Sequence, residues 1–484
     1  MYRILLILSL LSILSTSSFS IQRYLTEQLK RPLYSQVQLS YGLSIGVIQA
    51  YKLSQEKLIY GSKEWRSKTL FLADTQGEAA WQLGDYYQHQ KDYRSANVWF
   101  QQAISLNYFP AFDALAKLYQ VEQKFDQAWQ VLSAVDVAQH LSNSAFSNKV
   151  QLAVQLGNIE FLTNNYQRLN QYTQGRELLK KLYYYQVLKN DSPKHMPIKK
   201  CANSLQFFAT NMADLAHVSA LLRSIKHRLP ANHFCFETPR YRSLVQLQCH
   251  TQGDGAIVCN EQRWFDIADT IHSRYVGVLL PKGGANVHYG MLYIDRQDDS
   301  NVLLHELSHL LGLVDEYPLP NHHAFCNIKQ FNSSINVVSF PHTKQLIKPS
   351  RAKILARIPW RNHIKKTTPI MYRKNNYWLL GTPTSEKDTI GLYATNTCDE
   401  NPSQAFKAIN QGTKLSQNEL AFPKLYDQLL TQYPQRYRMP SFAYNLAIAA
   451  LIQGDHQRVS YWLQKALATE HNAQRRTKII NAEY

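Results

Sequence analysis

One segment, residues 299–317 (DSNVLLHELSHLLGLVDEY), constrains the fold more than any other part of the chain. His305 and His309 are four residues apart, so a helix places their imidazoles on one face, one turn above each other. Two imidazoles in this position can bind one metal ion, and Glu306 beside the first of them can handle a proton on a metal-bound water. The segment therefore predicts a helix that carries a catalytic metal site.

A third ligand is expected shortly after this helix. Gly312 can adopt a positive φ, which ends a helix and reverses the chain. Asp315, three residues later, then returns to the metal, which gives three protein ligands and one open position, the catalytic arrangement of zinc. If Asp315 is only a turn residue, the third ligand is one of Glu316, His322 and His323. With Asp315 as a ligand, Glu316 and Tyr317 are expected to support the site, and Glu316 to orient a histidine.

The amino terminus predicts export. Residues 1–20 combine Arg3, an apolar run at 4–14 that is too short to span a bilayer, and small residues at Ser18 and Ser20 that suit a cleavage site. These features are typical of a signal peptide, and the alternative is an uncleaved amino-terminal anchor. We therefore expect an exported protein, either periplasmic or secreted.

Six cysteines fit the oxidising compartment that an exported chain reaches. Two of them flank a turn at 253–255, two bracket the segment after the metal motif, and two remain. The pairs expected on this basis are Cys249–Cys259, Cys326–Cys398 and Cys201–Cys235. This is one of fifteen possible pairings, and the spacing alone does not choose among them. No CxxC pair is present, which argues against thiolate zinc ligands.

Residues 21–192 are predicted to be helical, and 77–135 within them contain a repeated helix pair. The small residues Gly84 and Ala96 recur as small residues 32 positions later, where they allow neighbouring helices to approach closely. The pattern resembles the tetratricopeptide repeat and its Sel1-like relatives. The alternative is an ordinary antiparallel helical bundle.

One more hairpin of this kind is predicted at 442–470, within a carboxyl-terminal helical region at 401–484. Helical repeats are thus expected on both sides of a middle domain. Such arrays either offer a concave surface to a protein partner or act as a rigid support.

Residues 193–400 predict a small α+β domain that begins after a linker marked by Pro193 and Pro197. The apolar spacing at 204–229 predicts a long amphipathic helix. Asp299 or Ser300 is expected to cap the metal helix. Strands are predicted at 243–249, 256–259, 275–281 and 286–294, with Gly283-Gly284 separating the last two.

The metal segment has the spacing HExxHxxGxxD, and Pro369-Ile370-Met371-Tyr372 follows about sixty residues downstream as a possible Met-turn. This combination resembles the metzincin zinc peptidases. HELSHLLGLVDEY is most similar to the IgA-peptidase family, whose motif also continues into Asp-Glu-Tyr. Many metzincins have a tyrosine two residues after the methionine, whereas this chain has Arg373 there and Tyr372 beside the methionine.

The resemblance covers about residues 200–400 and implies a zinc-dependent endopeptidase with a five-stranded sheet and two main helices. An edge strand beside the metal would hold the substrate, and 286–294 is the candidate, unless it is an ordinary strand. One Zn²⁺ per chain would be bound by His305, His309 and Asp315. Glu306 would be the general base, and Met371 would lie beneath the metal.

The formal charge of +18 is unevenly distributed, because residues 317–385 contain no Asp or Glu. This segment favours an acidic substrate or an anionic surface such as a cell envelope, and the alternative is a solvated basic face. Nucleic acid is not expected as a partner, since no nucleic-acid motif is present. The basic residues of the segment are Lys329, Lys344, Lys348, Arg351, Lys353, Arg357, Arg361, Lys365, Lys366, Arg373 and Lys374.

The predicted organisation is a signal peptide (1–20), helical repeats (21–192), a metzincin-like zinc peptidase domain (193–400) and the helical region at 401–484. The leading hypothesis is an exported zinc endopeptidase that hydrolyses proteins or peptides. One alternative is an inactive metallopeptidase-like scaffold that binds protein partners through its repeats. The intact Glu306 argues against this, because a pure binding domain needs no general base. A second alternative is an envelope factor that binds acidic polymers.

Overall fold

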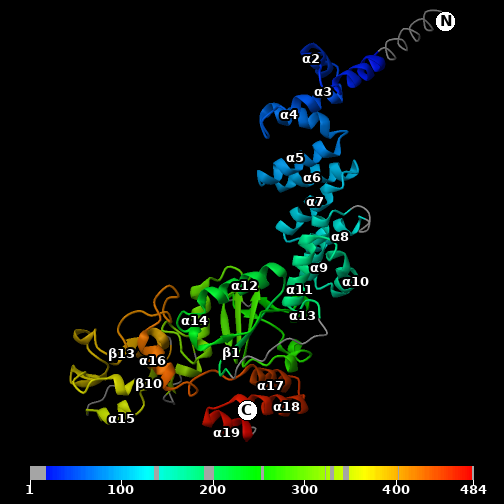
Figure 1. Ribbon diagram of the computed structural model, residues 1–484. Helices are drawn as coiled ribbons and strands as arrows, with labels where there is room; N and C mark the ends of the chain where they lie inside the picture. The colour runs from blue at the N-terminus through cyan, green and yellow to red at the C-terminus, as the bar shows by residue number, and fades with distance from the viewer. Residues whose placement is uncertain are drawn as a thin grey trace, which may run out of the picture. The chain divides into compact units, whose positions relative to one another are not determined.

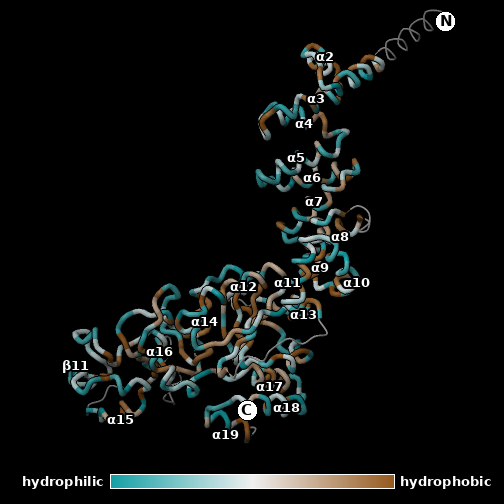
Figure 2. Tube along the Cα trace, in the orientation of Figure 1, coloured by the Kyte–Doolittle hydropathy of each residue, from teal (hydrophilic) through white to brown (hydrophobic). Residues whose placement is uncertain are grey.

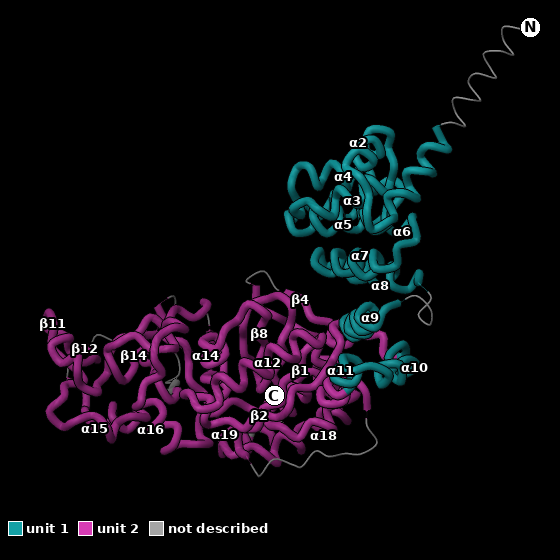
Figure 3. Tube along the Cα trace, turned by 45° about the horizontal axis from the view of Figure 1, so that its top comes forward, with its two compact units in different colours: residues 1–156, 160–179 teal, residues 157–159, 180–484 magenta. Residues whose placement is uncertain are grey.

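The computed structural model describes residues 18–135, 141–189, 201–251, 255–321, 323–326, 332–341, 348–399, 401 and 403–481. The chain forms two compact units (Figure 3). Unit 1 comprises residues 1–156 and 160–179, and unit 2 comprises 157–159 and 180–484. Most of the predicted signal segment and both prolines of the predicted linker lie outside the described residues.

Unit 1 is built from helices, as predicted for residues 21–192. Neighbouring helices pack as pairs, and Gly84 explains how one pair approaches closely. A Cβ atom at Gly84 would lie 2.4 Å from the ring of Phe100 on the next helix. The helices from this region are α2 (Gln36–Ser44), α3 (Ile48–Gln55), α4 (Lys63–Ala73), α5 (Gly77–His89), α6 (Tyr93–Ser105), α7 (Pro110–Val121), α8 (Phe125–Ser133), α9 (Asn143–Leu156), α10 (Ile159–Leu169) and α11 (Thr173–Tyr184).

The centre of unit 2 is a mainly parallel sheet (Figure 1). Its strands are β1 (Ser204–Ala209), β2 (Cys235–Phe236), β3 (Arg240–Tyr241), β6 (Tyr275–Leu280), β7 (Asn286–His288) and β8 (Met291–Asp295). The order is β2-β1-β6-β8-β7, and β3 also pairs with β1. All pairs are parallel except β7 with β8, so the terminal strand β7 runs against the rest. Helix α12 (Met212–Ile225) connects β1 to β2.

Three predicted elements differ from the structure. Residues 204–209 form the central strand β1 rather than the start of a long helix, because a strand buried on both faces shows no alternation and its apolar run imitates a helix. Residues 244–247 form helix α13 (Leu244–Leu247), which a capping box between Ser243 and Gln246 begins. The predicted strand at 286–294 is a hairpin, since Tyr289 and Gly290 adopt positive φ between β7 and β8.

The sheet is covered on both faces. Along β6 successive side chains alternate, so Val276, Val278 and Leu280 face one side. There they share a core with α17 (Phe442–Ile452) and α18 (His456–Thr469). The helical hairpin predicted at 442–470 is therefore present, and it packs on the sheet as part of unit 2. In Figure 1, α17 and α18 lie below the strands and α12 lies above them.

The rest of unit 2 surrounds a smaller sheet with the strand order β13-β14-β10-β9. The strands outside the main sheet are β4 (His250–Thr251), β5 (Ile257–Val258), β9 (Asn332–Ser333), β10 (Val337–Pro341), β11 (Met371–Lys374), β12 (Tyr377–Leu380), β13 (Tyr393–Thr395) and β14 (Ser403–Lys407). The further helices are α14 (Ser300–Leu310), α15 (Arg351–Leu355), α16 (Lys424–Gln432) and α19 (Ala473–Ile480). Short 3-10 turns connect several of these elements.

Three disulfides join all six cysteines, in the predicted pairs Cys201–Cys235, Cys249–Cys259 and Cys326–Cys398. Bridges of this number are typical of proteins that fold in an oxidising compartment. Among the described residues, no helix is both long enough and apolar enough to cross a bilayer.

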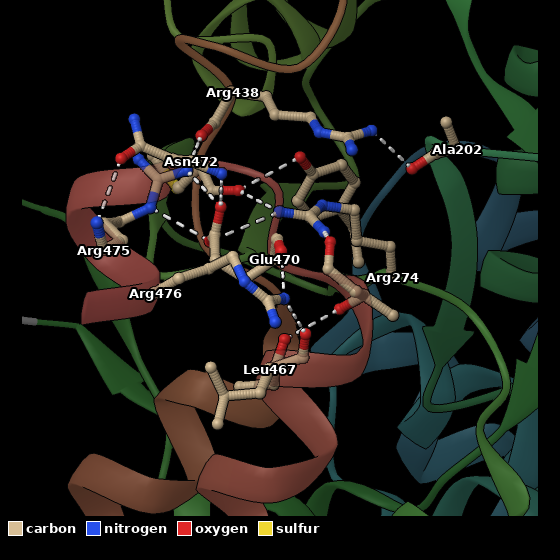
Figure 4. A network of polar contacts seen from close by, with 12 residues as sticks. Ala202, Arg274, Arg438, Leu467, Glu470, Asn472, Arg475 and Arg476 are labelled. Carbon is tan, nitrogen blue, oxygen red and sulfur yellow. Dashed lines mark hydrogen bonds and ion pairs between the residues drawn. The ribbon is translucent and has the colours of Figure 1, made fainter. Parts of the chain in front are cut away.

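A buried polar network holds the last helices to the main sheet (Figure 4). Glu470, only 3% exposed, accepts hydrogen bonds from Arg475 at 3.0 and 3.1 Å and lies 3.8 Å from the guanidinium of Arg274. Arg274 directly precedes β6 and donates to the carbonyls of Met439 and Thr469. Arg438 donates to the carbonyl of Ala202 at 3.0 Å. The network therefore connects the chain before β1 and β6 with the segment after α18.

Glu470→Gln should destabilise unit 2. Burial would raise the pKa of Glu470, but the hydrogen bond and charge of Arg475 hold it below its usual value of 4.5. A lowered pKa in the folded state contributes stability above the unfolded pKa, and this contribution is lost as the pH falls. We expect a loss of about 3–5 kcal/mol at neutral pH, because Arg274 loses its buried partner. The difference in the free energy of unfolding between the variant and the wild type should shrink below about pH 4.5.

The measurement is urea unfolding of both proteins at pH 7 and in acid, followed by tryptophan fluorescence. Asp388→Asn, at an exposed carboxylate, is the control and should change stability by less than about 0.5 kcal/mol. A Glu470→Gln variant as stable as wild type at pH 7 would contradict the assigned role.

Candidate metal centre

The metal motif lies on α14, and local signals define both ends of this helix. The side chain of Asp299 accepts hydrogen bonds from the backbone N–H groups of Asn301 and Val302, so Asp299 is the N-cap. Gly312 follows the last turn with φ +92°, as expected for the residue that ends the helix. The apolar face of α14 is buried through Leu303, Leu304, Leu307 and Leu310.

Two arginine contacts fix the start of α14 against α12. Arg228, just after α12, donates to the side chains of Ser300 at 2.8 Å and Asn301 at 2.9 Å. Arg296, in the loop from β8 to α14, donates to the buried carboxylate of Asp214 on α12 at 2.7 Å. The helix therefore cannot rotate about its axis without breaking charge-assisted hydrogen bonds.

Three potential metal-binding atoms converge on one point. The Nε2 atoms of His305 and His309 are 3.1 Å apart. Oδ1 of Asp315 lies 3.1 Å from Nε2 of His305 and 3.3 Å from Nε2 of His309. Ligands bound to a tetrahedral ion at about 2.0–2.1 Å stand about 3.4 Å from one another. The triangle formed by these three atoms therefore has the size that such an ion requires.

Glu306 belongs to the same cluster, since its carboxylate and the two imidazoles lie within 4.8 Å of one another. Two sets of three residues could thus hold an ion, one completed by Glu306 and one by Asp315. Asp315 is favoured because its Oδ1 lies 3.1 and 3.3 Å from the two Nε2 atoms, whereas the set with Glu306 is spread over as much as 4.8 Å. Its Oδ1 is also buried and accepts no hydrogen bond of regular geometry from the described residues. A buried carboxylate oxygen without a donor is costly, and a cation beside it removes that cost.

The hydrogen bond made by Nδ1 of each imidazole determines which ring nitrogen can bind a metal. Nδ1 of His305 lies 2.8 Å from the carbonyl oxygen of Lys414, and Nδ1 of His309 lies 3.0 Å from that of Leu313. A carbonyl oxygen only accepts, so each Nδ1 carries the proton. In the neutral ring each Nε2 then has a lone pair toward the triangle, which is the tautomer that a metal ligand needs, and a second proton on Nε2 must leave before a metal binds.

The electrostatics of the cluster favour positive charge at its centre. Burial would lower the pKa of His309, but the carboxylate of Asp315 raises it to about 10. Burial would raise the pKa of Asp315, but His309 and His305 hold it well below its usual range. Burial also raises the pKa of Glu306, against the opposing charges of the two histidines. Carboxylates gathered this closely stabilise a cation placed between the imidazoles.

The loop that carries Asp315 is held by polar side chains from the smaller sheet. Asn336 accepts from the backbone N–H of Val314 at 2.9 Å and donates to its carbonyl at 2.8 Å. The hydroxyl of Thr397 donates to the carbonyl of Asp315 at 2.7 Å, and that of Thr395 donates to the carbonyl of Glu316 at 3.0 Å. The third ligand is therefore positioned by hydrogen bonds on three successive residues.

The carboxylate of Glu316 is completely buried and receives four hydrogen bonds. The distances to Tyr426, Lys407, Thr413 and Asn336 are 2.7, 2.8, 2.8 and 3.2 Å. The expected contact between Glu316 and a histidine ring is not among them. Glu316 instead joins the ligand loop to β14, α16 and the segment around Thr413.

The segment 413–415 acts directly on the first histidine. The backbone N–H of Glu316 donates to the carbonyl of Leu415 at 2.9 Å, while the neighbouring carbonyl of Lys414 accepts from His305. Glu316 thus acts on His305 through the segment 413–415 rather than by direct contact. The sequence carries little signal for these partners, because isolated Lys, Thr and Tyr residues about one hundred positions downstream form no motif. A lysine at the end of the apolar strand β14, Lys407, is a weak sign of a buried ion pair.

Tyr317 and the described alternative third ligands lie outside the triangle of His305, His309 and Asp315. Tyr317 is 43% exposed, and its ring lies parallel to that of His305 with centroids 6.3 Å apart, so it borders the site. His323 is exposed, and its Nδ1 accepts from the backbone of Phe325. His322 lies outside the described residues. Of the alternative third ligands, Glu316 is fully engaged elsewhere.

Met371 and Tyr372 are not brought into the site. They begin β11, which pairs only with β12. Among the described residues, no hydrogen bond or ion pair joins either of them to the ligand triangle. In Figures 2 and 3, β11 lies at the end of unit 2 away from α14. The expectation that Met371 lies beneath the metal therefore differs from the structure, in which the segment 413–415 contacts His305.

A comparison of the chain with protein-family models finds no matching family, and a comparison with curated proteins finds no significantly similar relative.

Glu316→Gln should weaken both the fold and the metal site, because it leaves the buried ammonium of Lys407 without its anion. We expect the free energy of unfolding to fall by about 3–5 kcal/mol. Zn²⁺ affinity should fall about 10- to 100-fold, since the ligand loop and the His305 contact lose their common support. Urea unfolding and zinc titration measure the two effects. The double variant Glu316→Gln/Lys407→Met should recover part of the stability, and no recovery would contradict the ion-pair explanation.

Gly312→Ala should disturb the turn that leads to Asp315. A Cβ atom at Gly312 would lie 2.0 Å from the carbonyl oxygen of Tyr437, a backbone atom that cannot move aside. Gly454, with φ +73° and nothing within 4 Å of an added Cβ, provides the matched control. Gly454→Ala should cost about 1–2 kcal/mol from the positive φ alone. Gly312→Ala should cost clearly more and reduce zinc binding. Equal losses of stability would exclude close packing at Gly312.

Proposed function

We propose that this chain is a zinc-dependent endopeptidase of the metzincin type. The observation that carries the proposal is the triangle of His305, His309 and Asp315 with Glu306 beside it. Two histidines, one carboxylate and an open position are the donor set of catalytic zinc and also of non-haem iron(II). Zinc is proposed because Glu306, next to the first histidine, can act as the base on a metal-bound water. Each histidine also has the outer hydrogen bond that catalytic zinc ligands commonly make.

The architecture of unit 2 supports the resemblance. A metzincin-type domain is expected to have a five-stranded sheet and two main helices. The strand path β2-β1-β6-β8-β7 contains five strands, with β3 as a sixth, two-residue strand beside β1, and α12 and α14 pack against one another beside the sheet. The close helix pairs of unit 1 similarly support tetratricopeptide-like or Sel1-like repeats, and these are proposed as a surface for a protein partner.

Zinc bound at the triangle would lower the pKa of a water molecule to about 7 and polarise a peptide carbonyl. The chain itself supplies the proton transfers. Glu306 is buried beside the two imidazoles, and its carboxylate and their nitrogens lie within 4.8 Å of one another. It would take a proton from the attacking water and give it to the departing amine as the peptide bond breaks.

The position of β7 suggests how a substrate binds. β7 is the last strand of the sheet, antiparallel to β8, and packs near α14. An extended peptide can add to such an edge as another strand, with main-chain hydrogen bonds giving affinity without strong sequence preference. A peptide on this edge would lie beside the ligand triangle. An extended segment of a protein or peptide is therefore the proposed substrate.

The decisive experiment combines metal analysis with hydrolysis. The purified protein should contain one zinc per chain and hydrolyse casein, and a chelator should abolish the activity until zinc is restored. Asp315→Ala should lose zinc. Glu306→Gln should keep zinc and lose about 10²- to 10⁴-fold in rate, the range that a general base contributes.

Glu419→Gln, which removes an exposed carboxylate, is the control for Glu306→Gln and should retain activity. Full activity in Glu306→Gln would refute the proposed mechanism. Stoichiometric zinc without hydrolysis in the wild type would instead favour an inactive scaffold that binds partners.

A further inference from the structure

Part of the acid-free segment forms a basic surface. We call it the basic end, and define it as the exposed residues Lys348, Lys353, Lys365, Lys366, Arg373 and Lys374. Among the described residues, no ion pair involves any of the six. The positive charges near the metal centre behave differently, since Lys407 and Arg296 are each paired with a carboxylate at 2.7–2.8 Å.

Contacts join the parts of the basic end into one structure. The ammonium of Lys348, before α15, lies 5.0 Å from the centre of the Trp378 ring on β12. Arg351, the first residue of α15, donates to the carbonyls of Lys365 at 3.0 Å and Thr368 at 2.8 Å. These contacts bring α15, the loop at 365–368 and the β11–β12 hairpin together.

The β11–β12 hairpin is the most exposed part of this surface. Within the described part of the chain its strands pair only with each other, and Asn375 and Asn376 form its turn with positive φ. The alternation of side chains places Tyr372, Lys374, Tyr377 and Leu379 on one face. The opposite face carries Arg373 and Trp378. Aromatic and basic side chains are therefore present on both faces of a hairpin that no third strand covers.

We propose that the basic end docks unit 2 on the surface of a lipid bilayer that contains anionic lipids, with the hairpin tip at the level of the headgroups. Clustered Lys and Arg residues are attracted to anionic headgroups. Tyr and Trp favour the boundary between headgroups and acyl chains, because their rings are apolar and their polar atoms stay hydrated. An acidic polysaccharide would be bound by the charges alone, so the aromatic side chains on both faces of the tip favour the bilayer.

In this arrangement the surface that would bind the bilayer and the helix that carries the candidate metal site lie in different parts of unit 2. Figures 2 and 3 draw the hairpin at one end of unit 2 and α14 toward the middle of that unit. A protein attached through the basic end would keep α14 and the edge strand β7 away from the lipid. The docking surface does not depend on the proposed peptidase activity, and each can be tested without the other.

The test is sedimentation of the full chain with vesicles. One set contains only phosphatidylcholine, and the other contains about one-third phosphatidylglycerol as the anionic lipid. The protein should bind the anionic vesicles more strongly, and the excess should disappear at high salt, where charges are screened beyond a few ångströms. Equal binding to both sets would overturn the proposal, because it would show that charge does not direct the contact.

Matched variants identify the surface. Arg373→Gln/Lys374→Gln should weaken binding to anionic vesicles about 25-fold, since each cation near such a surface contributes about five-fold. Arg223→Gln/Lys226→Gln removes the same charge from exposed positions on and just after α12 and should change binding less than about two-fold. Equal losses in the two variants would overturn the assignment of the basic end.

A third variant tests the aromatic contribution. Tyr372→Ser keeps the net charge and should still weaken binding to the anionic vesicles. Binding to polygalacturonate that requires Arg373 and Lys374 but is unaffected by Tyr372→Ser, together with no binding to vesicles, would overturn the proposal in favour of an acidic polymer. Thermal unfolding of each variant establishes that its fold is intact.

Discussion

The buried carboxylate of Glu316 is the interaction on which the candidate metal centre depends. It lies next to the candidate ligand Asp315 and receives hydrogen bonds from four side chains on separate segments. One of these segments also presents the Lys414 carbonyl that orients His305. A carboxylate buried in this way is stable only when all its donors are present. The first and third ligands are therefore correctly placed only when β14, α16 and the segment 413–415 have folded around the ligand loop.

Burial of the main sheet on both faces removes the alternating pattern that marks a strand in a sequence. A half-exposed strand alternates between apolar and polar residues, but β1 is buried at five of its six positions, Gln206 included, and β6 is buried at all six. At 204–209 this continuity led to a helix prediction, whereas 275–281 was recognised because β-branched residues and a following Gly-Gly marked it. The covering hairpin α17–α18 lies more than 140 residues after the strands it protects. Pattern analysis within a short window cannot connect such distant segments.

The distribution of charge has two consequences in the folded protein. Within unit 2, Lys407 and Arg296 are each paired with a carboxylate, Glu316 and Asp214. The acid-free segment instead leaves its cations in solvent on α15 and the β11–β12 hairpin. The two parts of unit 2 therefore differ in whether their described cations are paired with carboxylates. The possible Met-turn at Met371 begins β11 in the acid-free segment, and β11 lies away from α14.

The sequence by itself determined the features that depend on local geometry. These were the helix with two candidate ligands on one face, its N-cap at Asp299, its end at Gly312, and a third candidate ligand at Asp315. Spacing along a helix and the freedom of glycine are independent of distant residues, so these inferences needed no tertiary information. Only the tertiary structure decided the partners of Glu316, the carbonyl that orients His305 and the position of Met371. Each of these depends on residues far apart in the chain that meet only when the two sheets of unit 2 have formed.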